Sequence, residues 1–278
     1  MLLYRYFASH ALESLRDSRL KVSCISSFND PFESRFGCGG EMNRAKAKQI
    51  NRQNKDAIVA VVKKLHPHLN RKEVRSHLKA TQNKWIDSFI DGYSSTEEGA
   101  MLEREKIIDN EFRVICFASS EAEPYDEILI WSHYAASHRG VRIGFEFPEN
   151  SSFSIAPIKY DRKRVSVDMS IMAIDPASQS RAISQSICTK SIGWAYEKEH
   201  RLFMDPKICK TGNGEDGSSI EFIELQSNWV KRIDFGTRYP QSEKATFLAL
   251  MREKYPHAEC HQARYHKTDY ALEYEKLT

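Results

Sequence analysis

The sequence is poor in several features, and each scarcity excludes a class of protein. Its six cysteines, among 278 residues, form no Cys-x-x-Cys pair, which excludes the usual spacing of a zinc ribbon. No apolar run approaches the ~20 residues that a membrane-spanning helix needs. The formal net charge is only +3, so charge alone does not indicate a nucleic-acid or membrane partner. Since no signal peptide is apparent, we expect reduced thiols and a cytoplasmic protein without a membrane partner.

The composition that remains is that of a folded globular protein, with 41% hydrophobic and 28% charged residues. Alternating apolar residues predict strands at 2–7, 20–25, 111–118, 141–147, 155–160, 199–203, 221–225, 229–235 and 260–265. Helical spacing predicts helices at 9–18, 128–137, 168–192 and 242–255, with Ser9 as the first N-cap. Residues 210–217 are predicted to form a hairpin loop.

Residues 41–110 are highly charged and predicted to be helical, with Pro67 and Gly92 dividing them into about three helices. The predicted strands do not alternate regularly with helices. We therefore expect a single α+β domain over residues 1–278, with an antiparallel or mixed sheet, flanking helices and a helical insertion at 41–110. No Gly-x-x-x-x-Gly-Lys-Ser/Thr loop occurs, so that standard phosphate cradle is excluded.

The most informative segment is Trp194-Ala-Tyr-Glu-Lys-Glu-His-Arg201. If it is extended, Glu197 and Glu199 point to one face of the sheet, and their repulsion raises one carboxyl pKa. Such a pair suits a site that holds a proton, a ribose hydroxyl or a developing positive charge. A solvated strand face with a surface ion pair to Arg201 is the alternative.

Two N-terminal segments carry further candidates. On a strand, Arg5 points away from Tyr4 and Tyr6, and a buried arginine needs an anionic partner, either a phosphate or the Glu197/Glu199 pair. An exposed arginine on an edge strand is the alternative. The segment Ser26-Ser-Phe-Asn-Asp-Pro-Phe-Glu33 is a rigid turn, whose acids Asp30 and Glu33 serve either in chemistry or as caps.

The segment Trp131-Ser-His-Tyr134 offers an aromatic surface for stacking, or else packs in the core. His133 and His138 are five residues apart and no carboxylate completes a ligand set, so no metal site is expected.

Together, these segments resemble the bacterial domain of unknown function 2971 family over about residues 2–265. The resemblance rests on Leu3-Tyr-Arg-Tyr, Leu20-Lys-Val-Ser, Phe28-Asn-Asp-Pro-Phe-Glu33, Cys116-Phe117, Ile130-Trp-Ser-His-Tyr134, His138-Arg-Gly140, Ile143-Gly-Phe145, Lys190, Trp194, Tyr196-Glu-Lys-Glu199 and Arg201. That family name implies no chemistry.

The layout of an arginine on the first strand, a serine-containing second strand and a late Glu-x-Glu is also similar to the ADP-ribosyltransferase superfamily. This similarity implies that Glu199 stabilises the oxocarbenium-like transition state and that Glu197 positions or deprotonates the acceptor. It also implies that NAD is the substrate. The residues then expected to bind NAD are Arg5, Ser26, Ser27, Asn29, Trp131, Tyr134, Tyr196 and Arg201.

The favoured function is therefore transfer of ADP-ribose from NAD to a protein, nucleic acid or small acceptor, as in a toxin or a phage-defence protein. Two alternatives stay open. The chain could be a non-enzymatic binding module that uses its helical insertion. It could also be a Mg²⁺-dependent nuclease that uses Asp30, Glu33, Glu197 and Glu199.

Overall fold

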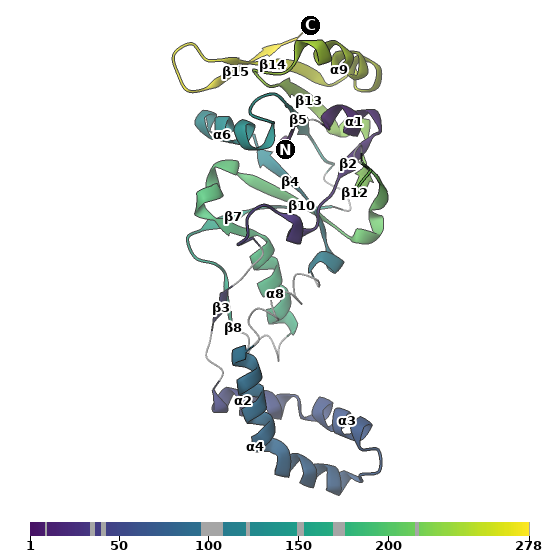
Figure 1. Cartoon of the computed structure of the whole chain (residues 1–278), viewed down its shortest axis with the longest axis vertical. Coiled ribbons are helices and arrows are strands. Elements are labelled where there is room, and N and C mark those ends of the chain that lie inside the picture. The colour runs from purple at the N-terminus through teal and green to yellow at the C-terminus, as the bar shows by residue number, and fades with distance from the viewer. Residues whose placement is uncertain are drawn as a thin grey trace. The chain divides into compact units, whose positions relative to one another are not determined.

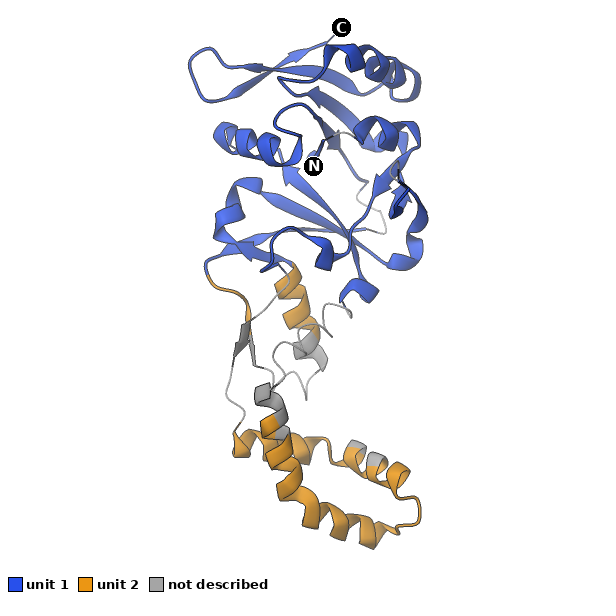
Figure 2. Ribbon diagram, viewed as in Figure 1, with its two compact units in different colours: residues 1–33, 108–162, 188–278 blue, residues 34–107, 163–187 orange. Residues whose placement is uncertain are grey.

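The computed structural model describes residues 1–8, 10–33, 37–39, 43–95, 108–120, 123–148, 153–168, 176–214 and 217–277, and Figure 1 labels its elements. The chain forms two compact units (Figure 2). The first unit comprises residues 1–33, 108–162 and 188–278, and the second comprises residues 34–107 and 163–187. No helix within the described ranges is long and apolar enough to cross a membrane.

The second unit contains the helices predicted for residues 41–110. These are α2 (Arg44–Gln53), α3 (Lys55–Leu65) and α4 (Arg71–Ser95). A capping box starts α4, because Asn70 Oδ1 accepts from Glu73 N at 3.0 Å while Glu73 Oε2 accepts from Asn70 N at 2.8 Å. Pro67 separates α3 from α4 as predicted, but α4 continues through Gly92. The unit also includes β3 (Gly37–Gly39), β8 (Ser166–Asp168) and α8 (Pro176–Ile187).

The first unit is built on an eight-stranded sheet with the order β15-β14-β13-β5-β1-β4-β10-β6. Only β13 and β14 run parallel, and the other neighbours are antiparallel. This mixed sheet confirms the α+β prediction. The strands are β1 (Leu3–Phe7), β4 (Arg113–Ser119), β5 (Val141–Phe145), β6 (Ser154–Pro157), β10 (Glu199–Met204), β13 (Val230–Phe235), β14 (Glu259–Tyr265) and β15 (Leu272–Lys276).

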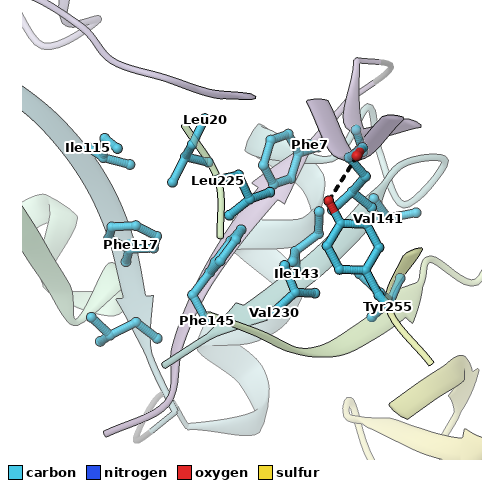
Figure 3. Packing of buried hydrophobic residues seen from close by; sticks show 14 of the residues in the cluster. Phe7, Leu20, Ile115, Phe117, Val141, Ile143, Phe145, Leu225, Val230 and Tyr255 are labelled. Carbon is cyan, nitrogen blue, oxygen red and sulfur yellow. Dashed lines mark hydrogen bonds between the residues drawn. The ribbon is translucent and has the colours of Figure 1, made fainter. Parts of the chain in front are cut away.

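One face of this sheet is apolar and carries the core (Figure 3). Strand register places Leu3 opposite Phe145 and Phe7 opposite Val141 on that face. It is covered by α1 (Ala11–Arg16), α9 (Gln241–Lys254) and a three-stranded sheet of β11 (Lys210–Asn213), β12 (Ser219–Glu224) and β2 (Arg19–Lys21). The Tyr255 hydroxyl donates to the Leu15 carbonyl at 2.8 Å. Each large side chain buried here contributes about 1.5–3 kcal/mol.

The opposite face carries polar groups beneath α6 (Pro124–Tyr134), which lies across it in Figure 1. The Arg142 guanidinium is buried there and donates to Asp234 Oδ2 at 2.8 Å and to Glu127 Oε1 at 2.6 Å. The Tyr274 hydroxyl donates to Glu127 Oε2 at 2.7 Å. Because every charge in this cluster has a partner, we interpret it as a structural ion cluster rather than a binding site.

Several predicted elements differ from the structure. The helix expected at 168–192 ends at Ile187, followed by β9 (Thr189–Ser191) and the 3-10 helix η2 (Ile192–Glu197). The strand expected at 155–160 is divided at Pro157 into β6 and β7 (Lys159–Asp161), because proline cannot donate a ladder hydrogen bond. The expected N-cap Ser9 lies outside the described residues. Strand β15 was not predicted.

Candidate functional site

The central sheet opens between β1 and β4. These strands pair only at Leu3–Ser119 and Tyr4–Ala118. Further along, Val114 pairs with Ser23 instead, in an isolated bridge. Between the two contacts, residues 115–117 have no strand partner on this edge within the described ranges. A cavity of about 380 Å³ lies at this opening.

The walls of the cavity come from segments far apart in the sequence. Strand β1 and the residues after it contribute Tyr4, Arg5, Tyr6 and His10, and the 26–33 turn contributes Ser27, Phe28, Asn29 and Glu33. Strand β4, α6 and the 190–199 segment contribute Cys116, Phe117, Tyr134, Lys190, Glu197 and Glu199. By strand register, Arg5 belongs to the apolar face of the sheet and Glu199 to the polar face. Since both line the cavity, the cavity connects the two faces through the opening.

A buried cluster of acids and bases forms the polar wall. Lys190 Nζ donates to Glu197 Oε2 at 2.7 Å and to Glu199 Oε2 at 3.1 Å. Arg201 Nε donates to Glu199 Oε1 at 2.6 Å, and its guanidinium also pairs with the Glu33 carboxylate. All five side chains are at least nine-tenths buried. Three carboxylates therefore share two cations, which leaves this wall with an excess of negative charge when all are ionised.

The backbone at Lys198 explains how Glu197 and Glu199 reach the same ammonium group. The sequence left open whether this segment is extended. In the structure it is not fully extended, because η2 ends at Glu197 and β10 begins only at Glu199. Between them Lys198 adopts the left-handed conformation, with φ 46° and ψ 46°. The Tyr160 hydroxyl accepts from the Glu199 backbone N–H at 2.7 Å and fixes the start of the strand.

Burial and charge shift the pKa values of this wall in predictable directions. Burial raises the pKa of Glu199, against the lowering effect of Lys190. Burial alone would lower the pKa of Lys190, but Glu199 and Glu197 outweigh it and raise this pKa. Burial also raises the pKa of Tyr134, helped by Glu197, whose Oε1 accepts the Tyr134 hydroxyl proton at 2.6 Å. The ammonium and the tyrosine hydroxyl therefore stay protonated and hold the Glu197 carboxylate in place.

Arg5 presents the opposite electrostatic situation. Its Nη1 donates to the Lys21 carbonyl oxygen at 2.7 Å, and its guanidinium lies 5.3 Å from the Phe7 ring centroid. In the part of the chain that the structure describes, no carboxylate pairs with it. Burial lowers the pKa of Arg5 to about 10. It remains a cation near neutral pH and faces the cavity without a counter-ion, an arrangement that favours an anionic ligand.

The structure brings together only some of the candidate binding residues. Arg5, Ser27, Asn29, Tyr134, Glu197 and Glu199 line the cavity. Four others do not line it: Ser26, Trp131, Tyr196 and Arg201.

Each of these four has another partner. The Ser26 hydroxyl bonds to Asp109, and Trp131 Nε1 donates to Tyr274 beside the Arg142 ion cluster. The Tyr196 hydroxyl bonds to His133 Nδ1 at 2.9 Å, and Arg201 is fully buried behind Glu199. In this structure these four side chains lie outside the lining of the cavity and bond to other residues instead.

The sequence did not assign a role to Lys190 or Cys116. Lys190 belongs to the family motif, and the spacing around it predicts a helix, whereas the structure places it in the short strand β9. Cys116 lines the cavity, and burial raises its pKa well above the ordinary value, so it remains a thiol.

A glycine spacing typical of dinucleotide-binding loops occurs in the segment 212–217. Gly212, Gly214 and Gly217 match Gly-x-Gly-x-x-Gly. Gly212 lies within β11, and Gly214 and Gly217 lie in the connection to the antiparallel strand β12, rather than between a strand and a helix. The spacing therefore does not form a dinucleotide cradle by itself.

Comparison with known families supports part of the expected resemblance. A family model described as "Protein of unknown function (DUF2971)" matches residues 130–202. This match spans the region from α6 to β10 and so includes Tyr134, Lys190, Glu197 and Glu199. No match was found among curated proteins or among solved structures.

Proposed function

We propose that the cavity binds NAD and that the chain transfers ADP-ribose from NAD to an acceptor. The observation that carries this proposal is the presence on one cavity of Arg5, a cation without a carboxylate partner in the described chain, and of the Glu197–Glu199 wall. NAD has the complementary charges, because its pyrophosphate is anionic and its nicotinamide ribose becomes positive during cleavage.

In the proposed reaction, the glycosidic bond between the nicotinamide nitrogen and ribose C1′ breaks, and its electron pair leaves with nicotinamide. The Glu199 carboxylate stabilises the resulting positive ribose, since an anion fixed in place interacts strongly with developing charge. The acceptor nucleophile then bonds to C1′ and gives its proton to Glu197. Tyr134 and Lys190 orient that carboxylate through bonds of 2.6 and 2.7 Å.

A metal-dependent nuclease fits the same residues less well. Lys190 Nζ already occupies the position between Glu197 and Glu199 that a Mg²⁺ ion would need. The Arg201 guanidinium takes the other Glu199 oxygen and the Glu33 carboxylate.

The acceptor in the proposed transfer is a protein or a nucleic acid, and modification of such a target would suit a toxin or a phage-defence protein.

The test combines NAD binding by calorimetry with release of nicotinamide. Glu199→Gln is expected to lower the turnover rate by about 10²–10³-fold, because it removes a charge used mainly in the transition state. Arg5→Gln is expected to weaken NAD binding instead, by loss of a charge-assisted hydrogen bond. Glu275→Gln is the matched control, since that carboxylate is 60% exposed and pairs with Arg264.

Three outcomes would count against the proposal. Absence of NAD binding by the parent chain would overturn it. NAD binding without nicotinamide release under any acceptor condition would favour a non-enzymatic binding module. Nucleic-acid cleavage that requires Mg²⁺ and is lost in Glu199→Gln would favour the nuclease.

A further inference from the structure

A second cavity, of about 260 Å³, lies in the first unit beside the three-stranded sheet. Its walls come from α1, β2 and β12, and they include Glu13, Arg19, Lys21 and Phe222. Arg19 lies with its guanidinium 5.2 Å from the Phe222 ring centroid and pairs with Asp17 at 3.0 Å. The cavity therefore combines an aromatic wall with charged groups of both signs.

The two cavities adjoin each other at named residues. His10 lines both of them. Arg5 lines the first cavity and donates to the carbonyl oxygen of Lys21, which lines the second. The boundary therefore carries the Arg5 guanidinium and the His10 imidazole, beside the Lys21 backbone. An anionic group that spans the two cavities would meet both side chains.

The first cavity is small among ligand pockets. At about 380 Å³ it lies near the lower end of the ~300–1,000 Å³ that ligand pockets occupy. Such a space suits one nucleoside with its phosphate rather than two. A ligand with two nucleosides joined by a pyrophosphate needs a neighbouring space of similar size and a cationic boundary.

We infer that the second cavity holds the adenosine half of the dinucleotide, with the pyrophosphate at Arg5 and His10. This inference rests on the proposed NAD-binding function and assigns the part of the ligand that the first cavity does not hold. The adenine ring packs against Phe222, as bases commonly do against aromatic side chains. The Glu13 carboxylate, which has no hydrogen-bond or ion-pair partner in the described part of the chain, accepts from the adenosine ribose hydroxyls.

An acidic residue at the ribose also determines specificity. A carboxylate bonds to a free 2′-hydroxyl but repels a 2′-phosphate. NAD should therefore bind more tightly than NADP. Glu13→Lys should reduce or reverse this preference, because the new ammonium attracts the phosphate that the carboxylate repels.

The experiment measures calorimetric affinities of the full chain for NAD, NADP and nicotinamide mononucleotide. Phe222→Ala is expected to weaken NAD binding by at least about tenfold through lost stacking. The affinity for nicotinamide mononucleotide, which contacts only the first cavity, should be unchanged. Tyr270→Ala is the matched aromatic control, because Tyr270 is 89% exposed and lines neither cavity.

The possible failures separate this inference from the proposed function. Parent chain that binds neither NAD nor nicotinamide mononucleotide would overturn both. Tight NAD binding that Phe222→Ala leaves unchanged would overturn the inference alone, as would an equal loss for both ligands. If Phe222→Ala does not fold by circular dichroism, Glu13→Lys decides. An unchanged ratio of NAD to NADP affinity in that variant would then overturn the inference.

Discussion

The backbone conformation of a single residue, Lys198, determines the geometry of the acidic wall. Alternate residues of a regular strand share a face but are separated along it. The left-handed backbone at Lys198 instead joins η2 to β10, so that Glu197 and Glu199 meet the same ammonium group. The Lys198 side chain itself is exposed. Its backbone conformation, rather than its charge, is therefore what the site uses.

Substitutions at Lys198 test this distinction. Lys198→Gly is expected to change the free energy of unfolding by less than about 1 kcal/mol, because glycine adopts positive φ without strain. Lys198→Val should destabilise by about 1–3 kcal/mol, since a β-branched residue is strained there. Urea denaturation measures both. Equal effects of glycine and valine would show that the left-handed conformation at this position is unimportant.

The raised pKa of Glu199 gives activity and stability opposite pH dependences. The proposed transfer needs the ionised carboxylate, so its nicotinamide release should fall as pH drops through a value above the ordinary 4.5. For stability the sign is reversed. A carboxyl whose pKa is raised by folding contributes most below its unfolded pKa, and this contribution is lost as pH rises through the folded pKa.

Rate and urea-unfolding profiles between about pH 4 and pH 8 check this prediction, because that range covers the ordinary glutamate pKa and its raised values. Glu199→Gln should lack the corresponding step in its stability profile. An acid limb of the rate at or below the ordinary glutamate pKa would contradict the proposed role of burial.

At the scale of elements, the connection between α6 and β5 is tightly constrained. Ala136, Ser137 and His138 all have positive φ, of 47°, 55° and 68°. Gly140 follows, just before β5. Its carbonyl oxygen accepts from the backbone N–H of Gly236, the residue after β13, at 3.0 Å. A Cβ at Gly236 would overlap the carbonyl of His138. This close backbone contact sets the end of β13 against the end of α6.

Alanine substitution of two glycines measures the importance of that contact. Gly236→Ala is expected to destabilise the chain by roughly 3 kcal/mol, because backbone atoms on both sides must move. Gly193→Ala is the control, since its nearest neighbour to a Cβ would be Ser191 Oγ at 3.9 Å. That change should alter stability by less than about 1 kcal/mol. Comparable thermal shifts in the two variants would contradict this interpretation.

Prediction from the sequence succeeded where the local pattern was strong. Alternation along β5 located a core strand, and the glutamates at 197 and 199 line the cavity. Lys190 could not be placed, because the residues before it have helical spacing although Lys190 itself lies in the short strand β9. The opening between β1 and β4 could not be predicted either. It depends on which distant segment pairs with Val114. The local sequences around Val114 and around its partner Ser23 do not contain that information.

At the scale of the whole molecule, the cores that the described residues form differ greatly in size between the two units. The first unit buries a large cluster that runs from Leu3 to Tyr255. The helices of the second unit bury Ala47, Ile50 and Ile86 in a cluster of their own. Because burial of apolar area is the main stabilising term, the second unit should be the less stable of the two.

Hydrogen exchange followed by mass spectrometry tests this difference. Amides of α2 and α4 are expected to exchange well before those of β5 and β10. Ile86→Ala should accelerate exchange in α2–α4, because deletion of a buried isoleucine side chain costs about 2–5 kcal/mol. Ile143→Ala provides the equivalent change in the first unit. Equal protection of the two units in the parent chain would show that they unfold together.

The opening in the sheet also affects how far ligand binding depends on the side chains around the cavity. The unpaired edge of β4 at residues 115–117 faces a cavity instead of another strand. The donors and acceptors along this edge belong to the peptide backbone, which every residue type carries. A ligand that bonds to this edge would keep those bonds when the side chains around it are replaced. Binding at such a site can therefore persist through extensive sequence divergence.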